Sequence, residues 1–129
     1  MPLVRITMAQ GRTPAERRAI ADGVHQALVE TAKVPADDRF QVVDEVAPQD
    51  LIWSASYLGI EHTAGVVFVQ IVLNAGRTAE VKKALYAAIA DRLAEHAAVR
   101  REDVIVNLVE VPRDNWSFGG GVMSYPPVG

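Results

Sequence analysis

The sequence contains no cysteine, and this absence excludes disulfide bonds, thiolate nucleophiles and zinc sites with thiolate ligands. No apolar run approaches the roughly 20 residues that a membrane-spanning helix needs, and the first residues lack the pattern of a signal peptide. The three histidines, His25, His62 and His96, have no metal-ligand spacing, and we expect them at the surface. We therefore expect a cytoplasmic chain with no membrane segment, no bound metal and no cofactor.

The sequence also lacks a large excess of either charge. The formal net charge of -3 provides no basic surface for nucleic acid, so a small molecule is the expected partner. The length of 129 residues and the hydrophobic content of 50% suffice for one domain with a modest core. No linker or low-complexity segment divides the chain. These features predict a single domain over residues 1–129.

A long internal repeat organises the chain. Residues 4–48 align without a gap on residues 69–113, so that each residue pairs with the one 65 positions later. The segment VRITMAQGRT (Val4–Thr13) pairs in this way with VQIVLNAGRT (Val69–Thr78). We therefore expect two pseudo-repeats, at about 2–48 and 66–113, followed by a C-terminal tail at 114–129.

Each copy has the pattern of a strand, a helix and a second strand. The expected strands are short β-rich runs, at about 3–8, 39–46, 66–73 and 104–111. The expected helices have apolar residues at helical spacing, at about 14–32 and 79–96. Thr13, with Glu16 three residues later, predicts an N-cap and a capping box, and Thr78 predicts a simpler cap.

The repeat predicts an α+β fold. Two right-handed β-α-β units form a four-stranded sheet with both helices on one face. The runs VVFVQIVL (Val66–Leu73) and VIVNLVEV (Val104–Val111) are apolar at nearly every position, which is typical of strands buried on both faces. Since two helices cover one face only, we expect other copies of the chain to cover the second face in a homo-oligomer.

The chain begins Met-Pro and continues directly into the first expected strand. Methionine aminopeptidases remove Met before small residues, proline included, which would leave Pro2 with a free secondary amine. Burial lowers the pKa of such an amine, and a neighbouring carboxylate raises it. Pro2 is therefore a candidate acid or base, although many proteins begin Met-Pro without a functional reason.

The whole pattern resembles the tautomerase superfamily. The paired β-α-β units with Pro2 at the start of the first strand are similar to members of that superfamily, which generally form trimers. More narrowly, PLVRI (Pro2–Ile6), VPADDRFQ (Val34–Gln41) and NWSFGGG (Asn115–Gly121) resemble the malonate semialdehyde decarboxylase group. The resemblance covers nearly the whole chain and implies a tautomerase-like homotrimer.

The resemblance also implies a set of site residues. These are Pro2 as the acid or base amine, Asp38 as the carboxylate near it, Arg77 as the ligand of the substrate carboxylate, Asn74 where the family pattern has a second arginine, and Trp116 and Phe118 as an apolar wall.

Each of these residues also has a structural interpretation. Arg77 has a repeat partner, Arg12, in an identical Gly-Arg-Thr turn, and Asp38 has a partner in Asp103 that could cap a turn. Asn74 could be a polar turn residue. The two aromatic residues could belong to the core or to trimer contacts.

Three functions follow for this set of residues. The first is decarboxylation of a small 3-oxo acid, malonate semialdehyde, to acetaldehyde, with promiscuous tautomerase and hydratase activity on 2-oxo or 3-oxo acids. The second is an enol–keto tautomerase of the phenylenolpyruvate or 4-oxalocrotonate type. The third is a non-catalytic trimeric binding module in which Pro2 is chemically idle.

Overall fold

The computed structural model describes residues 1–127, and the last two residues of the expected tail, 128–129, lie outside the described residues. Its main elements are β1 (Leu3–Ala9), α1 (Pro14–Ala32), β2 (Phe40–Val46), β5 (Val67–Asn74), α2 (Ala79–His96) and β6 (Val104–Val111). A short hairpin of β3 (Ser56–Tyr57) and β4 (Ile60–Glu61) joins the two halves. Single 3-10 turns occupy Pro48–Asp50, Arg101–Asp103 and Arg113–Asn115.

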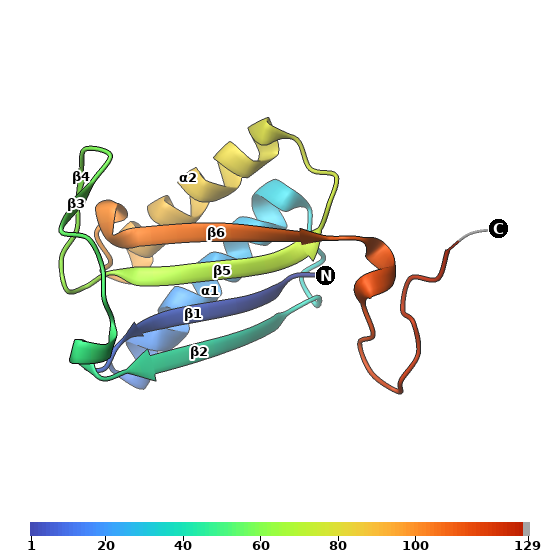
Figure 1. Cartoon of the computed structure of the whole chain (residues 1–129), viewed down its shortest axis with the longest axis horizontal. Coiled ribbons are helices and arrows are strands. Elements are labelled where there is room, and N and C mark those ends of the chain that lie inside the picture. The colour runs from blue at the N-terminus through green and yellow to red at the C-terminus, as the bar shows by residue number, and fades with distance from the viewer. Residues whose placement is uncertain (128–129) are drawn as a thin grey trace.

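The four long strands form one mixed sheet in the order β2-β1-β5-β6. Strands β1 and β2 are parallel, β5 and β6 are parallel, and the two central strands β1 and β5 are antiparallel. Both helices lie on the same face of this sheet (Figure 1). The predicted α+β arrangement of two β-α-β units is therefore confirmed.

Local sequence explains where the helices begin. The side chain of Thr13 accepts a hydrogen bond from the backbone N–H of Glu16, and the Glu16 side chain accepts one from the backbone N–H of Thr13. This is the predicted capping box, with Pro14 at the first helical position. Thr78 caps α2 with a single bond from the N–H of Val81.

The core lies between the helices and the sheet. Alternate residues of the central strands point to the helices and are buried, among them Ile6 and Ile71. The helices contribute their predicted apolar positions, all at most 1% exposed: Ile20, Val24, Ala27, Leu28, Leu85, Ile89 and Leu93. Gly23 allows the helices to approach closely, because a Cβ there would lie 2.8 Å from Cδ1 of Leu93.

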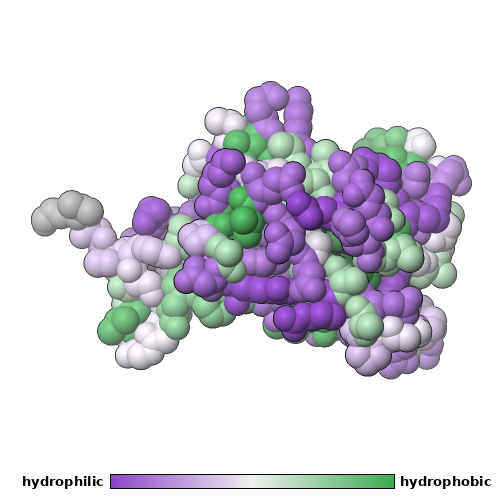
Figure 2. All heavy atoms as spheres, turned by 180° about the vertical axis from the view of Figure 1, so that it is seen from behind, coloured by the Kyte–Doolittle hydropathy of each residue, from purple (hydrophilic) through white to green (hydrophobic). Residues whose placement is uncertain are grey.

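The two faces of the layered fold differ in polarity. Seen from the helix side, the surface is mostly hydrophilic (Figure 2). The opposite face of the sheet has no helix of residues 1–127 packed over it, and it leaves apolar side chains more than a third exposed, namely Leu3, Phe40, Val42 and Val109.

The segments that carry the predicted site residues gather at one end of the sheet. The N-terminus and the segment that follows β6 lie at this end, and the β3–β4 hairpin lies at the opposite end (Figure 1). No helix within residues 1–127 is long and apolar enough to cross a membrane.

The packing generates a stability prediction. Ile89 is fully buried between α2 and the sheet, so Ile89→Ala should lower the free energy of unfolding by about 2–5 kcal/mol through lost burial and a cavity. Lys83→Ala on the same helix, at a side chain that is 75% exposed, should change it by less than about 0.5 kcal/mol. Urea unfolding at one fixed protein concentration measures both. Equal losses in the two variants would contradict this description of the core.

Candidate active site

Three segments far apart in the sequence meet beside the N-terminus. Leu3 pairs with Phe40 in the parallel ladder and with Val72 in the antiparallel ladder. The residues ahead of Leu3 therefore extend between the loop before β2 and the end of β5. Sheet register thus brings Pro2, Asp38 and Asn74 to one end of the molecule.

The N-terminal amine and Asp38 form an ion pair. The amine belongs to Met1 in this chain, and it contacts Oδ2 of Asp38 directly. Both side chains are largely buried, with 23% of Met1 and 18% of Asp38 exposed. Burial first, and then the positive charge of Arg77, lower the pKa of this amine from 8.0 to about 6. Pro2 follows directly and is itself buried.

Arg77 joins the end of β5 to the end of α1. Its Nη1 donates to the carbonyl of Asn74 at 3.2 Å, and its Nη2 donates to the carbonyl of Ala32 at 3.2 Å. A guanidinium has five N–H donors, so these two bonds leave others free for an anion. Arg77 therefore has the structural role of a turn residue and still places a cation near the amine.

Asn74 is buried, with 4% of its surface exposed. Its Oδ1 accepts a hydrogen bond of 2.7 Å from Nε1 of Trp116, and its Nδ2 lies 3.3 Å from the thioether sulfur of Met1. This amide therefore connects the C-terminal segment to the N-terminus.

Trp116 and Phe118 form an aromatic stack over the start of β2. The ring centroids of Trp116 and Phe118 are 5.1 Å apart, and those of Phe118 and Phe40 are 5.3 Å apart. These rings line a hollow of about 240 Å³ together with Leu3 and Ser117. Our sequence analysis missed Phe40 as part of this wall, although it lies within the VPADDRFQ segment that carried the family resemblance.

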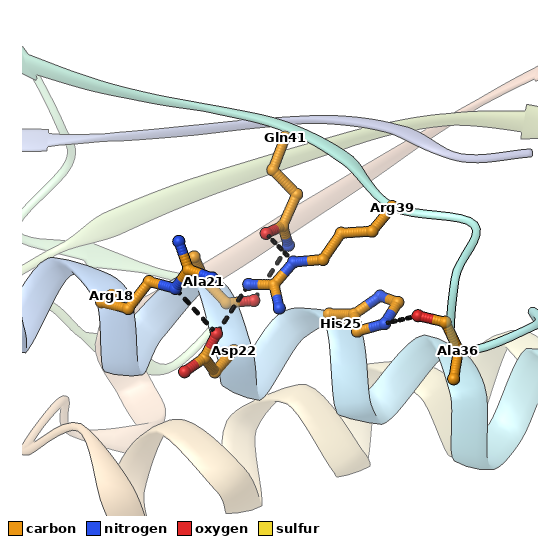
Figure 3. Close-up of polar contacts among 7 residues, drawn as sticks. All are labelled: Arg18, Ala21, Asp22, His25, Ala36, Arg39 and Gln41. Atoms are coloured by element: carbon orange, nitrogen blue, oxygen red, sulfur yellow. Dashed lines mark hydrogen bonds and ion pairs between the residues drawn. The ribbon is translucent and has the colours of Figure 1, made fainter.

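Polar contacts to α1 on both sides of Asp38 hold its loop in place (Figure 3). Before Asp38, the ring Nε2 of His25 donates to the carbonyl of Ala36 at 2.9 Å. After it, Nη2 of Arg39 contacts Oδ1 of Asp22 at 2.7 Å. Hydrogen bonding from Arg39 is the main reason why the pKa of Asp22 is lowered. The carboxylate of Asp38 therefore projects from an anchored loop.

The expectation that all three histidines are surface residues is wrong for His25. It is 4% exposed, because it lies on the side of α1 that the loop covers, where a backbone carbonyl accepts its ring N–H. His62 is partly exposed and His96 is exposed. Within residues 1–127, no group of three or more His, Cys, Asp or Glu could hold a metal ion.

Family models match most of the chain. A model described as a tautomerase enzyme matches residues 38–119, and a second model with the same description matches residues 2–59. The probable tautomerase YusQ of Bacillus subtilis is 36% identical over 94% of this chain and 95% of its own length.

Solved structures of tautomerases and of a malonate semialdehyde decarboxylase are also similar to this chain. The crystal structure of FG41 malonate semialdehyde decarboxylase inhibited by 3-bromopropiolate is 41% identical, with a TM-score of 0.90 over 95% of this chain and 93% of that one. A symmetric trimer of wild-type fused 4-OT is 28% identical, with a TM-score of 0.78 and 95% of each chain covered.

The site predicts how substitutions change the titration of the amine. Arg77→Ala should raise the pKa of the terminal amine above 6, because a nearby cation that disfavours its protonation is removed. Asp38→Asn should lower that pKa further, because the ion pair that favours the protonated form is lost. Titration of the ¹⁵N-labelled terminal nitrogen by NMR in the chain that retains Met1 measures both shifts. Unchanged pKa values in both variants would show that neither side chain acts on the amine.

Proposed function

Because the chain belongs to the tautomerase family of enzymes, and within it resembles the malonate semialdehyde decarboxylase group, we propose that the free amine of Pro2 acts on a small keto acid. The main reaction would be decarboxylation of malonate semialdehyde to acetaldehyde, with side activity as a tautomerase and hydratase. The observation that carries this proposal is the contact between the terminal amine and Asp38 with Arg77 close by.

The active form would be the chain without Met1. The amine of Met1 contacts Asp38, and its sulfur contacts Asn74. Removal of Met1 would therefore vacate space between these two side chains and turn the amide nitrogen of Pro2 into a basic secondary amine. A substrate could then occupy the vacated space beside Arg77.

Binding would begin with the carboxylate of the substrate. The remaining N–H donors of Arg77 could hold it bidentately, which fixes its plane. The rings of Trp116 and Phe118 would form an apolar wall beside the carbon skeleton and help to exclude water. Asn74 would contribute a neutral hydrogen-bond donor in place of a second arginine.

Decarboxylation would use the protonated form of Pro2. Asp38 favours this form, and the ammonium would donate a hydrogen bond to the aldehyde oxygen of the substrate. The bond between the carboxylate carbon and its neighbour breaks, its electron pair enters the enolate, and carbon dioxide leaves. The enolate carbon then takes a proton from the Pro2 ammonium, which gives acetaldehyde, and water reprotonates the amine. The ammonium stabilises the charge that develops on oxygen in a site with little water.

A second candidate, enol–keto tautomerisation, is favoured by the low pKa of the N-terminal amine. Burial and the charge of Arg77, which lower the pKa of the Met1 amine, would lower the pKa of the Pro2 amine in the same direction and favour its neutral form. A neutral amine would act as a general base that moves a proton between the oxygen and carbon of an enol. The protonation state of Pro2 therefore decides between the two reactions.

A homotrimer is the proposed assembly. The uncovered sheet face exposes Leu3, Val42 and Val109, and contact with further copies of this chain would bury these side chains. The similar fused 4-OT structure is a trimer.

The mechanism predicts the effect of two substitutions on the mature protein. Pro2→Ala would replace a secondary with a primary amine, and Arg77→Ala would remove the carboxylate ligand. Each should lower the rate of carbon dioxide release from malonate semialdehyde by well over tenfold. Arg12→Ala, at the repeat partner of Arg77, is the matched control and should lower it less. An unchanged rate in Pro2→Ala would exclude the mechanism, whereas no carbon dioxide release by the mature wild-type protein would favour the non-catalytic trimeric module.

A comparison of two substrates separates the enzymatic alternatives. With malonate semialdehyde and phenylenolpyruvate assayed on the same preparation, the decarboxylase proposal predicts the larger kcat/KM for malonate semialdehyde. If tautomerisation of phenylenolpyruvate is far faster, the tautomerase is the main activity.

A further inference from the structure

The amide of Asn74 can lie in one orientation only. The indole Nε1 of Trp116 is 2.7 Å from Oδ1 of Asn74, and an indole N–H can donate a hydrogen bond but cannot accept one. The amide oxygen must therefore face Trp116, and the amide NH₂ must face the other way. We propose that Trp116 is a positioning residue that aims the NH₂ group of Asn74 at the substrate.

Burial makes this orientation costly to change. Asn74 is 4% exposed, so an amide turned by 180° would place its NH₂ against the indole N–H and leave both donors without an acceptor. A buried polar group without a partner costs about 1–3 kcal/mol. The ring of Trp116 is also fixed, because it stacks on Phe118 at an interplanar angle of 9°.

The aimed NH₂ group faces the space that Met1 now occupies. Its Nδ2 lies 3.3 Å from the sulfur of Met1, and a thioether is a weak acceptor. Removal of Met1 would leave this buried donor without that partner, in the same space as Asp38 and the terminal amine. An oxygen atom of a bound keto acid is a stronger acceptor and would take the place of the sulfur.

A neutral donor at this position has an electrostatic advantage. Arg77 already lowers the pKa of the terminal amine through its charge, and a second cation at position 74 would lower the pKa further. The NH₂ group of Asn74 would instead donate a hydrogen bond to the substrate without lowering the pKa of the terminal amine. This part of the inference rests on the proposed function, whereas the orientation of the amide does not.

The first test detects the hydrogen bond between Trp116 and Asn74 by NMR and needs no activity assay. The chain has two tryptophans, so Trp116→Phe assigns the Trp116 indole N–H signal in the NMR spectrum of the mature protein. We expect this proton to exchange slowly with water in the wild type and in Asn74→Asp, where a carboxylate oxygen still accepts. It should exchange much faster in Asn74→Ala. Equal exchange in all three proteins would overturn the proposed bond.

The second test uses malonate, a dicarboxylate that does not react, as the binding probe. Asn74→Asp keeps the shape and the acceptor for Trp116 but replaces the aimed donor with an anion, so malonate affinity should fall at least tenfold. Trp116→Phe keeps an aromatic ring and loses the N–H, and the affinity should fall severalfold. Trp53→Phe, the same change at the other tryptophan, should leave it unchanged.

A double-mutant cycle separates positioning from general packing. If Trp116 acts through Asn74, Trp116→Phe should weaken malonate binding severalfold in the wild type and very little in Asn74→Ala. Equal losses in both backgrounds would mean that the indole acts as an apolar wall only, and the proposal would be wrong. If malonate binds as described but malonate semialdehyde is not decarboxylated, the proposed function fails and the positioning role of Trp116 stands.

Discussion

The contact between the N-terminal amine and Asp38 depends on three distant segments that meet at one end of the sheet. Opposing influences act on this amine. The carboxylate of Asp38 favours the charged form of the Met1 amine, whereas burial and the cation of Arg77 lower the pKa of this amine to about 6. The amine of Pro2 would meet the same carboxylate and the same cation once Met1 is removed, and an amine with a pKa near 7 can serve as an acid or as a base. The capped helices, the sheet register and the anchored loop before β2 all hold the groups that set this balance.

The repeat places the same residue types at the opposite end of the sheet. There, other residues of the chain form hydrogen bonds with them. Asp103, the partner of Asp38, accepts hydrogen bonds from the backbone and the side chain of Thr63. Arg12 donates to the carbonyl of Gly65 at 2.8 Å. An uninterrupted backbone supplies amide N–H groups there and no basic amine. The internal repeat therefore leaves the proposed site at one end of the sheet, and at the other end the same residue types stabilise the connection between the halves.

The periodic parts of the fold could be predicted from sequence, because helix caps and apolar spacing are local signals. The helix at 14–32 and its cap at Thr13 are examples. Contacts between distant residues carried no such signal. Neither the burial of His25 against the Ala36 carbonyl nor the bond between Trp116 and Asn74 follows from spacing. The site residues themselves came from a family resemblance, and their roles stay predictions until they are tested.

The proposed reaction requires a basic amine at Pro2. The most direct measurement compares carbon dioxide release from malonate semialdehyde by the mature protein and by the same chain with one residue left ahead of Pro2, with intact mass confirming each N-terminus. The extra residue changes the amine of Pro2 into an amide and, like Met1, fills the space between Asp38 and Asn74. We predict turnover by the mature protein and almost none by the extended chain. Equal rates in the two forms would show that the reaction does not need the amine of Pro2.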